Sequence, residues 1–187
     1  MRGITVAVLA AAGLAACSPA AEKQRAPAEA ANGCAAHVAT AWRTAGGGFA
    51  VSATTAGVDC AHATATLSMR DGESKEVYTA AASTADIMTL APAHDVDAMQ
   101  TALAEWIDPA QDVGSTKDLP AWGAGAENPL KGEFPFYPEE NVTRDAYEAL
   151  RAANAPMFCY VQGMESQACI AWTDGHMIKV GVQTFPG

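Results

Sequence analysis

Two cysteine–histidine pairs are the residues whose types and spacing could do chemistry. Cys34 precedes His37 by three residues, and Cys60 precedes His62 by two. Thiolate and imidazole are ligands that zinc and copper accept, so the four side chains would suit a metal site. If residues 34–45 form a helix, however, His37 points about 60° away from Cys34. His62 lies on the polar face of its predicted strand, and we therefore predict no metal ligands and no cofactor.

The sequence lacks the motifs of familiar catalytic sites. It has no His-Glu-x-x-His, no Gly-x-Ser-x-Gly, no phosphate-binding glycine-rich loop and no Cys-x-x-Cys-His. Glu139, Glu140 and His176 would be the candidates of an unrecognised active site, but their spacing defines no geometry. We therefore predict no catalytic residues and favour a protein that is not an enzyme.

A long irregular segment, 108–142, carries the aromatic residues that could contact a partner. Long irregular segments in a compact domain are usually functional or disordered, and aromatic residues argue against complete disorder. Two interpretations stay open, a binding loop and a lid folded over the core. The candidate partner-contact residues are Trp122, Phe134, Phe136 and Tyr137.

Acidic residues are concentrated in one part of the chain. Residues 76–142 hold twelve acids against two lysines, a balance of −10 that equals the formal charge of the whole chain. This charge disfavours nucleic acid and anionic lipid surfaces as partners. It could attract a basic partner, or it could be a solvated acidic surface that keeps the protein soluble.

The N-terminus has the pattern of an export signal. Arg2 supplies a positive charge, and the apolar run 4–12 is shorter than the roughly 20 residues that span a bilayer. Leu14-Ala15-Ala16-Cys17 then resembles the lipobox of bacterial lipoproteins. The resemblance implies that residues 1–16 are a signal peptide and that Cys17 becomes an acylated N-terminus carrying palmitate-type chains. Ser18 in the next position implies the periplasmic face of the outer membrane.

Residues 17–33 are rich in Ala, Pro and charge and contain no large apolar side chain. Such a segment cannot bury a core, so we predict a disordered tether. The remaining residues, 34–187, have a length that suits a single domain.

Four cysteines remain when the lipidated one is set aside, and an even number in an exported chain implies two disulfides. Three connectivities are open, and we favour Cys34–Cys60 and Cys159–Cys169. For the second pair, strands on either side of a turn centred near Met164 place the cysteines directly opposite each other. Opposed residues have Cα atoms about 4.5–5.5 Å apart, which suits a disulfide.

Residue patterning predicts an α+β fold with helices packed on antiparallel sheet. A meander with one buried face is expected at the C-terminal end, where Asp174-Gly175 is a strong hairpin signal. The order α-βββ-αα-loop-α-βββ suggests two α-βββ halves. The predicted helices are 34–45, a short one from Ser83, 95–107 and 143–154, and the predicted strands are 49–55, 60–69, 75–82, 157–162, 167–173 and 176–184.

These features together predict a lipid-anchored periplasmic protein that acts as a non-catalytic binding, inhibitory or envelope-assembly module. Its expected partners are the membrane, through the lipid anchor, and an envelope protein, with no nucleic acid. The alternatives are a periplasmic metal-binding protein and an enzyme with an unrecognised site.

Overall fold

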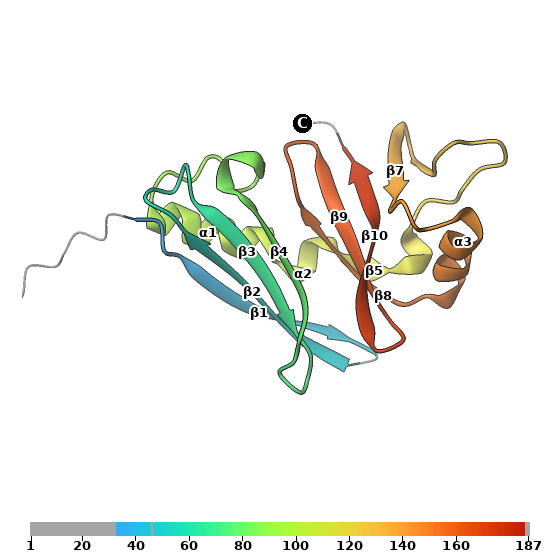
Figure 1. Cartoon of the computed structure of the whole chain (residues 1–187), viewed down its shortest axis with the longest axis horizontal. Helices are drawn as coiled ribbons and strands as arrows, with labels where there is room; N and C mark the ends of the chain where they lie inside the picture. Colours follow the sequence, from blue (N-terminus) through green and yellow to red (C-terminus); the bar gives the residue numbers. More distant parts are fainter. Residues whose placement is uncertain (1–32, 46, 186–187) are drawn as a thin grey trace, which may run out of the picture. The chain divides into compact units, whose positions relative to one another are not determined.

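Two antiparallel sheets form most of the fold in the computed structural model, which describes residues 33–45 and 47–185 (Figure 1). The first sheet has the order β1-β2-β3-β4, and the second has the order β5-β8-β9-β10-β7-β6. The strands of the first sheet are β1 His37–Thr44, β2 Gly47–Ala56, β3 Thr64–Arg70 and β4 Glu76–Ser83. Those of the second are β5 Val113–Ser115, β6 Leu130–Lys131, β7 Phe134–Pro138, β8 Pro156–Val161, β9 Ser166–Thr173 and β10 His176–Thr184.

Three α-helices and two 3₁₀ turns accompany these strands. The helices are α1 Val96–Trp106, α2 Pro109–Asp112 and α3 Arg144–Ala153, and the 3₁₀ turns are η1 Thr84–Asp86 and η2 Thr116–Asp118. The fold is therefore α+β and rich in β-structure, as the sequence predicted in its broad class. The short helix expected from Ser83 is the 3₁₀ turn η1.

The first sheet buries one face, as its residue alternation dictates. Val51, Ala53, Leu67 and Met69 are buried on the inner face of β2 and β3. The outer face carries only small residues in the middle of the sheet. Exposed or half-buried positions there are Ala39, Ala41, Ala50, Ser52, Thr54, Thr66, Ser68, Thr79 and Ala81.

The helix predicted for residues 34–45 is wrong, because these residues form strand β1. His37 to Thr44 pair with β2 in continuous antiparallel register, from Thr54 to Gly47. Alanine gives the segment a high helix propensity, but tertiary pairing overrides such propensities. Val38, Thr40 and Trp42 recur with a period of two and turn toward the core. The first half is thus ββββ, and the suggestion of two α-βββ halves is wrong as well.

The C-terminal meander forms as predicted from β8, β9 and β10. Asp174 and Gly175 make the turn between β9 and β10 with φ angles of 51° and 78°, the left-handed conformation that a type I′ turn requires. Cys159 lies directly opposite Cys169 in the β8–β9 register. The predicted position of the turn near Met164 is therefore confirmed.

The expectation that one face of this meander is buried is wrong, because both faces are covered. Phe158, Tyr160 and Ile170 belong to a core shared with the first sheet and α1. Met157 and Val180, on the other face, belong to a second core. The second core also holds Leu119, Phe136, Tyr147, Cys159, Cys169 and Ala171.

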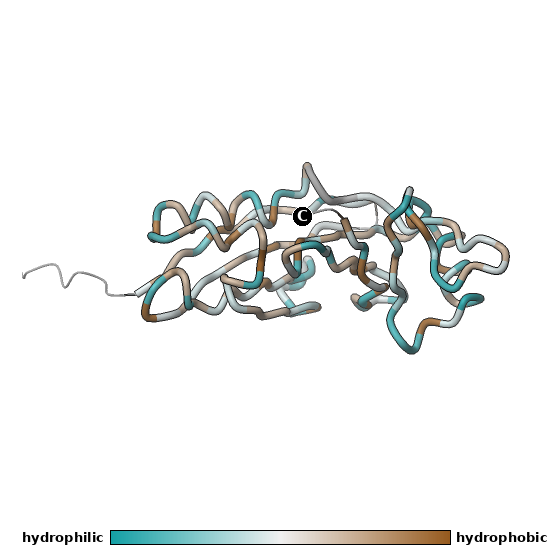
Figure 2. Tube along the Cα trace, turned by 90° about the horizontal axis from the view of Figure 1, so that it is seen from above, coloured by the Kyte–Doolittle hydropathy of each residue, from teal (hydrophilic) through white to brown (hydrophobic). Residues whose placement is uncertain are grey.

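The two longer helices begin at the capping residues that the sequence indicates. The Asp95 side chain accepts a hydrogen bond from the Ala98 N–H at 2.8 Å, and the Thr143 side chain accepts one from the Ala146 N–H at 3.2 Å. Helix α1 turns Leu103 and Trp106 into the core, and polar and apolar residues alternate around its turns (Figure 2). Both helices confirm the sequence prediction.

Candidate binding site

The Cys34–Cys60 disulfide removes the sulfur ligands of the metal hypothesis. The two sulfur atoms are bonded, with Cα atoms 4.7 Å apart. His62 is exposed and its Nδ1 lies 2.8 Å from Asp59 Oδ1, and this hydrogen bond lowers the pKa of Asp59. His37 lies on the exposed outer face of β1. Among residues 33–45 and 47–185 no three His, Cys, Asp or Glu side chains gather into a possible metal site.

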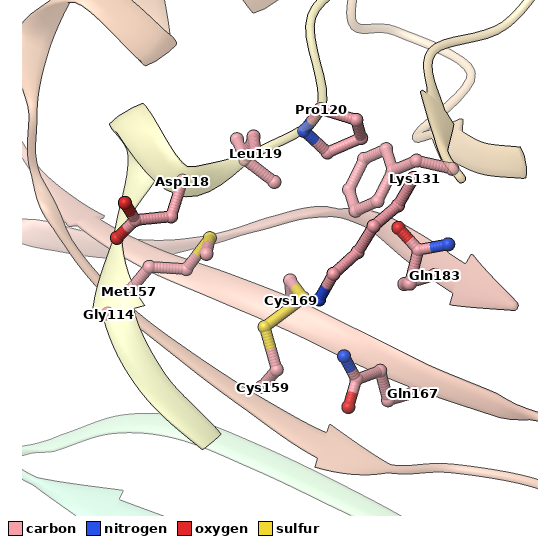
Figure 3. A pocket seen from close by; sticks show the side chains of 11 residues that line it. Gly114, Asp118, Leu119, Pro120, Lys131, Met157, Cys159, Gln167, Cys169 and Gln183 are labelled. Atoms are coloured by element: carbon pink, nitrogen blue, oxygen red, sulfur yellow. A yellow bond between two sulfur atoms is a disulfide. The ribbon is translucent and has the colours of Figure 1, made fainter. Parts of the chain in front are cut away.

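The Cys159–Cys169 disulfide forms as predicted and lines a cavity of about 270 Å³ (Figure 3). Phe136 and Met157 form apolar walls, and Lys131 extends over the cavity toward Cys169. The other lining residues are Gly114, Asp118, Leu119, Pro120, Gln167 and Gln183.

The polar groups of this cavity are largely engaged with the chain around it. Asp118 Oδ2 accepts hydrogen bonds from the N–H and the hydroxyl of Ser115, at 2.9 and 3.2 Å. These bonds, the backbone N–H first, lower the pKa of Asp118. Gln183, buried, donates from Nε2 to the carbonyl oxygens of Phe134, Pro135 and Thr184. Asp118 therefore caps the 3₁₀ turn η2, and Gln183 ties β10 to β7.

The four aromatic residues predicted as partner contacts differ in burial. Phe136 is 1% exposed and Trp122 is half-buried; both pack near Tyr147, with ring centroids 5.8 and 5.5 Å from its ring. Phe134 is half-buried at the start of β7. Tyr137 is 47% exposed and is the member of the set most accessible to a partner.

The residues named for an unrecognised active site are engaged elsewhere or exposed. Glu139 Oε1 lies 2.8 Å from Lys179 Nζ. His176 is exposed beside the Asp174 carbonyl, 3.2 Å from its Nδ1. Glu140 is exposed, and no hydrogen bond joins it to the other two within the described residues. The structure therefore builds no acid–base pair from them.

A different site lies along the outer edge of β4, and the sequence analysis did not predict it. Helices α1 and α2 contact β1, the opposite edge strand of the first sheet, whereas β4 contacts β10 of the second sheet without pairing with it. The Thr84 N–H donates to the Ala63 carbonyl, so Thr84 and Ala63 form a hydrogen-bonded pair. From this pair onward, hydrogen-bonded and non-hydrogen-bonded pairs alternate along β3 and β4. By that alternation Ala80 and Ala82 bond to β3, whereas the backbone groups of Thr79 and Ala81 face outward. No hydrogen bond recorded for the described residues uses these outward groups.

A cavity of about 200 Å³ adjoins this edge, and we call it the β4 pocket. Ala80 and Ala82 leave the space because their side chains are small, and Trp106 and Tyr160 lie across from them. The residues that line it are Ala80, Ala81, Ala82, Ile87, Trp106, Tyr160 and Gln162.

Hydrogen bonds hold the aromatic walls of the β4 pocket in place. Trp106 Nε1 donates to the Val161 carbonyl at 2.6 Å. The hydroxyls of Tyr78 and Tyr160 lie 2.6 Å apart, which ties β4 to β8. Burial, and then the bond to Tyr78, raise the pKa of the Tyr160 hydroxyl. The pocket is therefore formed before any ligand arrives.

The residues that directly precede two of the lining residues in the chain are acidic. Asp86 and Glu105, both exposed, precede the lining residues Ile87 and Trp106 in the chain. No lysine or arginine lines the pocket or adjoins a lining residue in sequence. An apolar pocket beside backbone groups without a partner strand can bind an extended peptide.

Cys17 and the lipobox-like motif lie outside the described residues, as do the predicted signal peptide and the predicted tether up to residue 32. In the part of the chain that the structure describes, no helix is long and apolar enough to cross a membrane.

Comparison of the chain with protein-family models, with curated proteins and with solved structures gives no match.

Proposed function

We propose that the protein is a lipid-anchored, non-catalytic binding module of the bacterial cell envelope, which holds an extended segment of a partner protein along β4. The observation that carries the proposal is the outward-facing backbone of Thr79 and Ala81 beside the β4 pocket. A partner strand added there would satisfy these groups, and the pocket would take one of its side chains.

The sequence of β4 supports this role. Proteins usually protect edge strands with lysine, proline, inward charges or a covering element. The residues of β4 after Glu76 include neither a charge nor a proline. The neighbouring strand β10 contacts β4 but does not pair with it, so among the described residues the outward backbone groups of β4 have no partner strand. Such an edge is either a liability or a binding surface. The preformed aromatic pocket beside it favours the binding surface.

Lipid anchoring is tested by the Cys17→Ser variant in a Gram-negative host. We expect wild-type protein in the outer-membrane fraction, with a mass increased by acyl chains at Cys17. The variant should lose both the added mass and the membrane association. Wild-type protein that is unacylated would overturn the anchor.

Strand addition is tested on the purified domain with a fluorescent nine-residue peptide of alternating Thr and Val with a central Leu. We expect the fluorescence anisotropy of the peptide to report binding to the wild type. Ala81→Pro should abolish this binding, because proline removes an outward N–H of β4 that does not bond to β3. Ala80→Leu, which fills the pocket, should weaken binding as well.

Ala41→Leu, on the exposed outer face of β1, is the matched control and should bind as the wild type does. Thermal unfolding of all three variants identifies any loss that comes from misfolding. If folded Ala81→Pro and Ala80→Leu both bind the peptide normally, the β4 edge is not the site.

A further inference from the structure

We infer that the cavity beside the Cys159–Cys169 disulfide binds a small organic acid, whose carboxylate pairs with Lys131 and whose apolar body lies against the sheet. This cavity shares no lining residue with the β4 pocket. The inference therefore does not depend on strand addition at β4.

One face of the second sheet forms the floor of the cavity. Gln167, Gln183 and Phe136 lie in one row across β9, β10 and β7, because the strands pair at these positions. Cys169, two residues after Gln167, points to the same face of the sheet. It is bonded to Cys159, directly opposite on β8. The floor is therefore an aromatic ring and a disulfide with two side-chain amides beside them.

The opposite wall comes from the segment after η2 and from β6. Leu119 and Pro120 lie across the cavity from the disulfide, and Lys131 of β6 reaches in from another side (Figure 3). A cavity of roughly 150 Å³ is enough to bind a benzene-sized molecule. The volume of about 270 Å³ found here therefore has room for a ring or a short aliphatic chain together with an acid group.

Two polar side chains that line the cavity lack a partner. In the part of the chain that the structure describes, no ion pair or hydrogen bond engages the Lys131 ammonium or the Gln167 side-chain amide. The Lys131 side chain extends toward the disulfide, and the Gln167 amide lies on the same side of the cavity (Figure 3). A ligand carboxylate near them would accept hydrogen bonds from both groups, and the bond from the ammonium would be charge-assisted.

The charges of the cavity favour a ligand with a single acid group. Lys131 supplies one positive charge, and among the described residues that line the cavity only Asp118 is acidic. Asp118 turns away from Lys131 (Figure 3), and its Oδ2 is engaged by the N–H and the hydroxyl of Ser115. A second negative charge on the ligand would find no cation and would be repelled by Asp118.

The test measures the dissociation constants of four small molecules by NMR titration of the purified protein. Phenylpropionate and hexanoate each combine an acid group with an apolar body. Phenylpropanamide has the same body as phenylpropionate without the charge, and acetate has the charge without the body. We expect both larger acids to bind, with phenylpropionate roughly threefold to tenfold tighter than phenylpropanamide, because the exposed Lys131 pairs only with the acid. Acetate should bind most weakly of the three acids, because it leaves the apolar walls uncovered.

Variants assign the binding to this cavity. Lys131→Gln should lose the preference for phenylpropionate over phenylpropanamide, whereas Lys131→Arg should keep most of it. Lys75→Gln, which removes the same charge from an exposed turn outside the cavity, should bind as the wild type does. Ala80→Leu, which fills the β4 pocket, should also leave binding of the acids unchanged.

Three results would overturn the inference. They are failure of both larger acids to bind, equal affinity of wild-type protein for phenylpropionate and phenylpropanamide, and an unchanged preference in Lys131→Gln. None of them bears on peptide binding along β4, which is measured separately with Ala81→Pro.

Discussion

The two disulfides should differ in how much they stabilise the fold, because they close loops of different length. Cys34 and Cys60 are 26 residues apart, whereas Cys159 and Cys169 are 10 apart. A cross-link stabilises mainly by removing conformations from the unfolded chain, and the effect grows with the logarithm of loop length.

These loop lengths give an estimate of how much each disulfide stabilises the folded state. The chain-entropy relation yields about 3.5 kcal/mol for the longer loop and about 2.7 kcal/mol for the shorter one at 25 °C. All four cysteines are at most 6% exposed. Replacing either pair by alanine should therefore cost similar packing energy, and a difference of about 0.8 kcal/mol should remain.

The measurement compares Cys34→Ala/Cys60→Ala with Cys159→Ala/Cys169→Ala under oxidising conditions. Urea unfolding followed by circular dichroism gives the free energy of unfolding of each variant. We expect the first double variant to be the less stable. If the second is equally or more destabilised, loop closure is not the source of the difference and the reasoning fails.

Three further substitutions test contacts of the C-terminal half. Gly181→Ala should lower the free energy of unfolding by about 1–3 kcal/mol in urea titrations, because a Cβ there would collide with the Tyr137 carbonyl oxygen of β7. Thr143→Ala should cost about 1 kcal/mol in the same assay, because the cap of α3 is lost, while Thr143→Ser should restore it. The hydrogen bond from Arg151 lowers the pKa of Glu148, so its stabilising effect is complete above the usual pKa of 4.5 and is lost as pH falls through the lowered pKa. Glu148→Gln should therefore reduce the loss of stability on acidification. Thermal midpoints measured from about pH 6 to about pH 2, which brackets ordinary carboxyl pKa values, check this expectation.

The elements that the sequence predicted well have strong local signals. Asp174-Gly175 makes its turn with its own backbone preferences, and Thr143 caps α3 with its own side chain. The pairing of Cys159 with Cys169 follows from the position of one hairpin. These features depend on residues close in the chain, so a local pattern is enough to predict them.

The features that the sequence did not reveal depend on distant residues. Strand β1 has alanines that favour a helix, and only its pairing with β2 and its place in the core make it extended. The β4 pocket brings together Ala80, Trp106 and Tyr160, which are far apart in the chain. A run of alanines carries no sign of binding by itself, and its meaning comes from the edge position of β4.

The division of the strands between the two sheets affects the order in which the fold can assemble. Strands β1 to β4 come from one continuous stretch of chain, so their sheet can form from neighbouring hairpins. Its core, however, is completed by residues more than a hundred positions later: Trp42 contacts Phe158, and Phe49 contacts Trp172. The chain is synthesised from its N-terminus, so the inner face of the first sheet stays uncovered until β8 and β9 have been made. An apolar sheet face exposed in this way favours aggregation, and a Cys34–Cys60 bond formed within the N-terminal half would help to hold the incomplete sheet together.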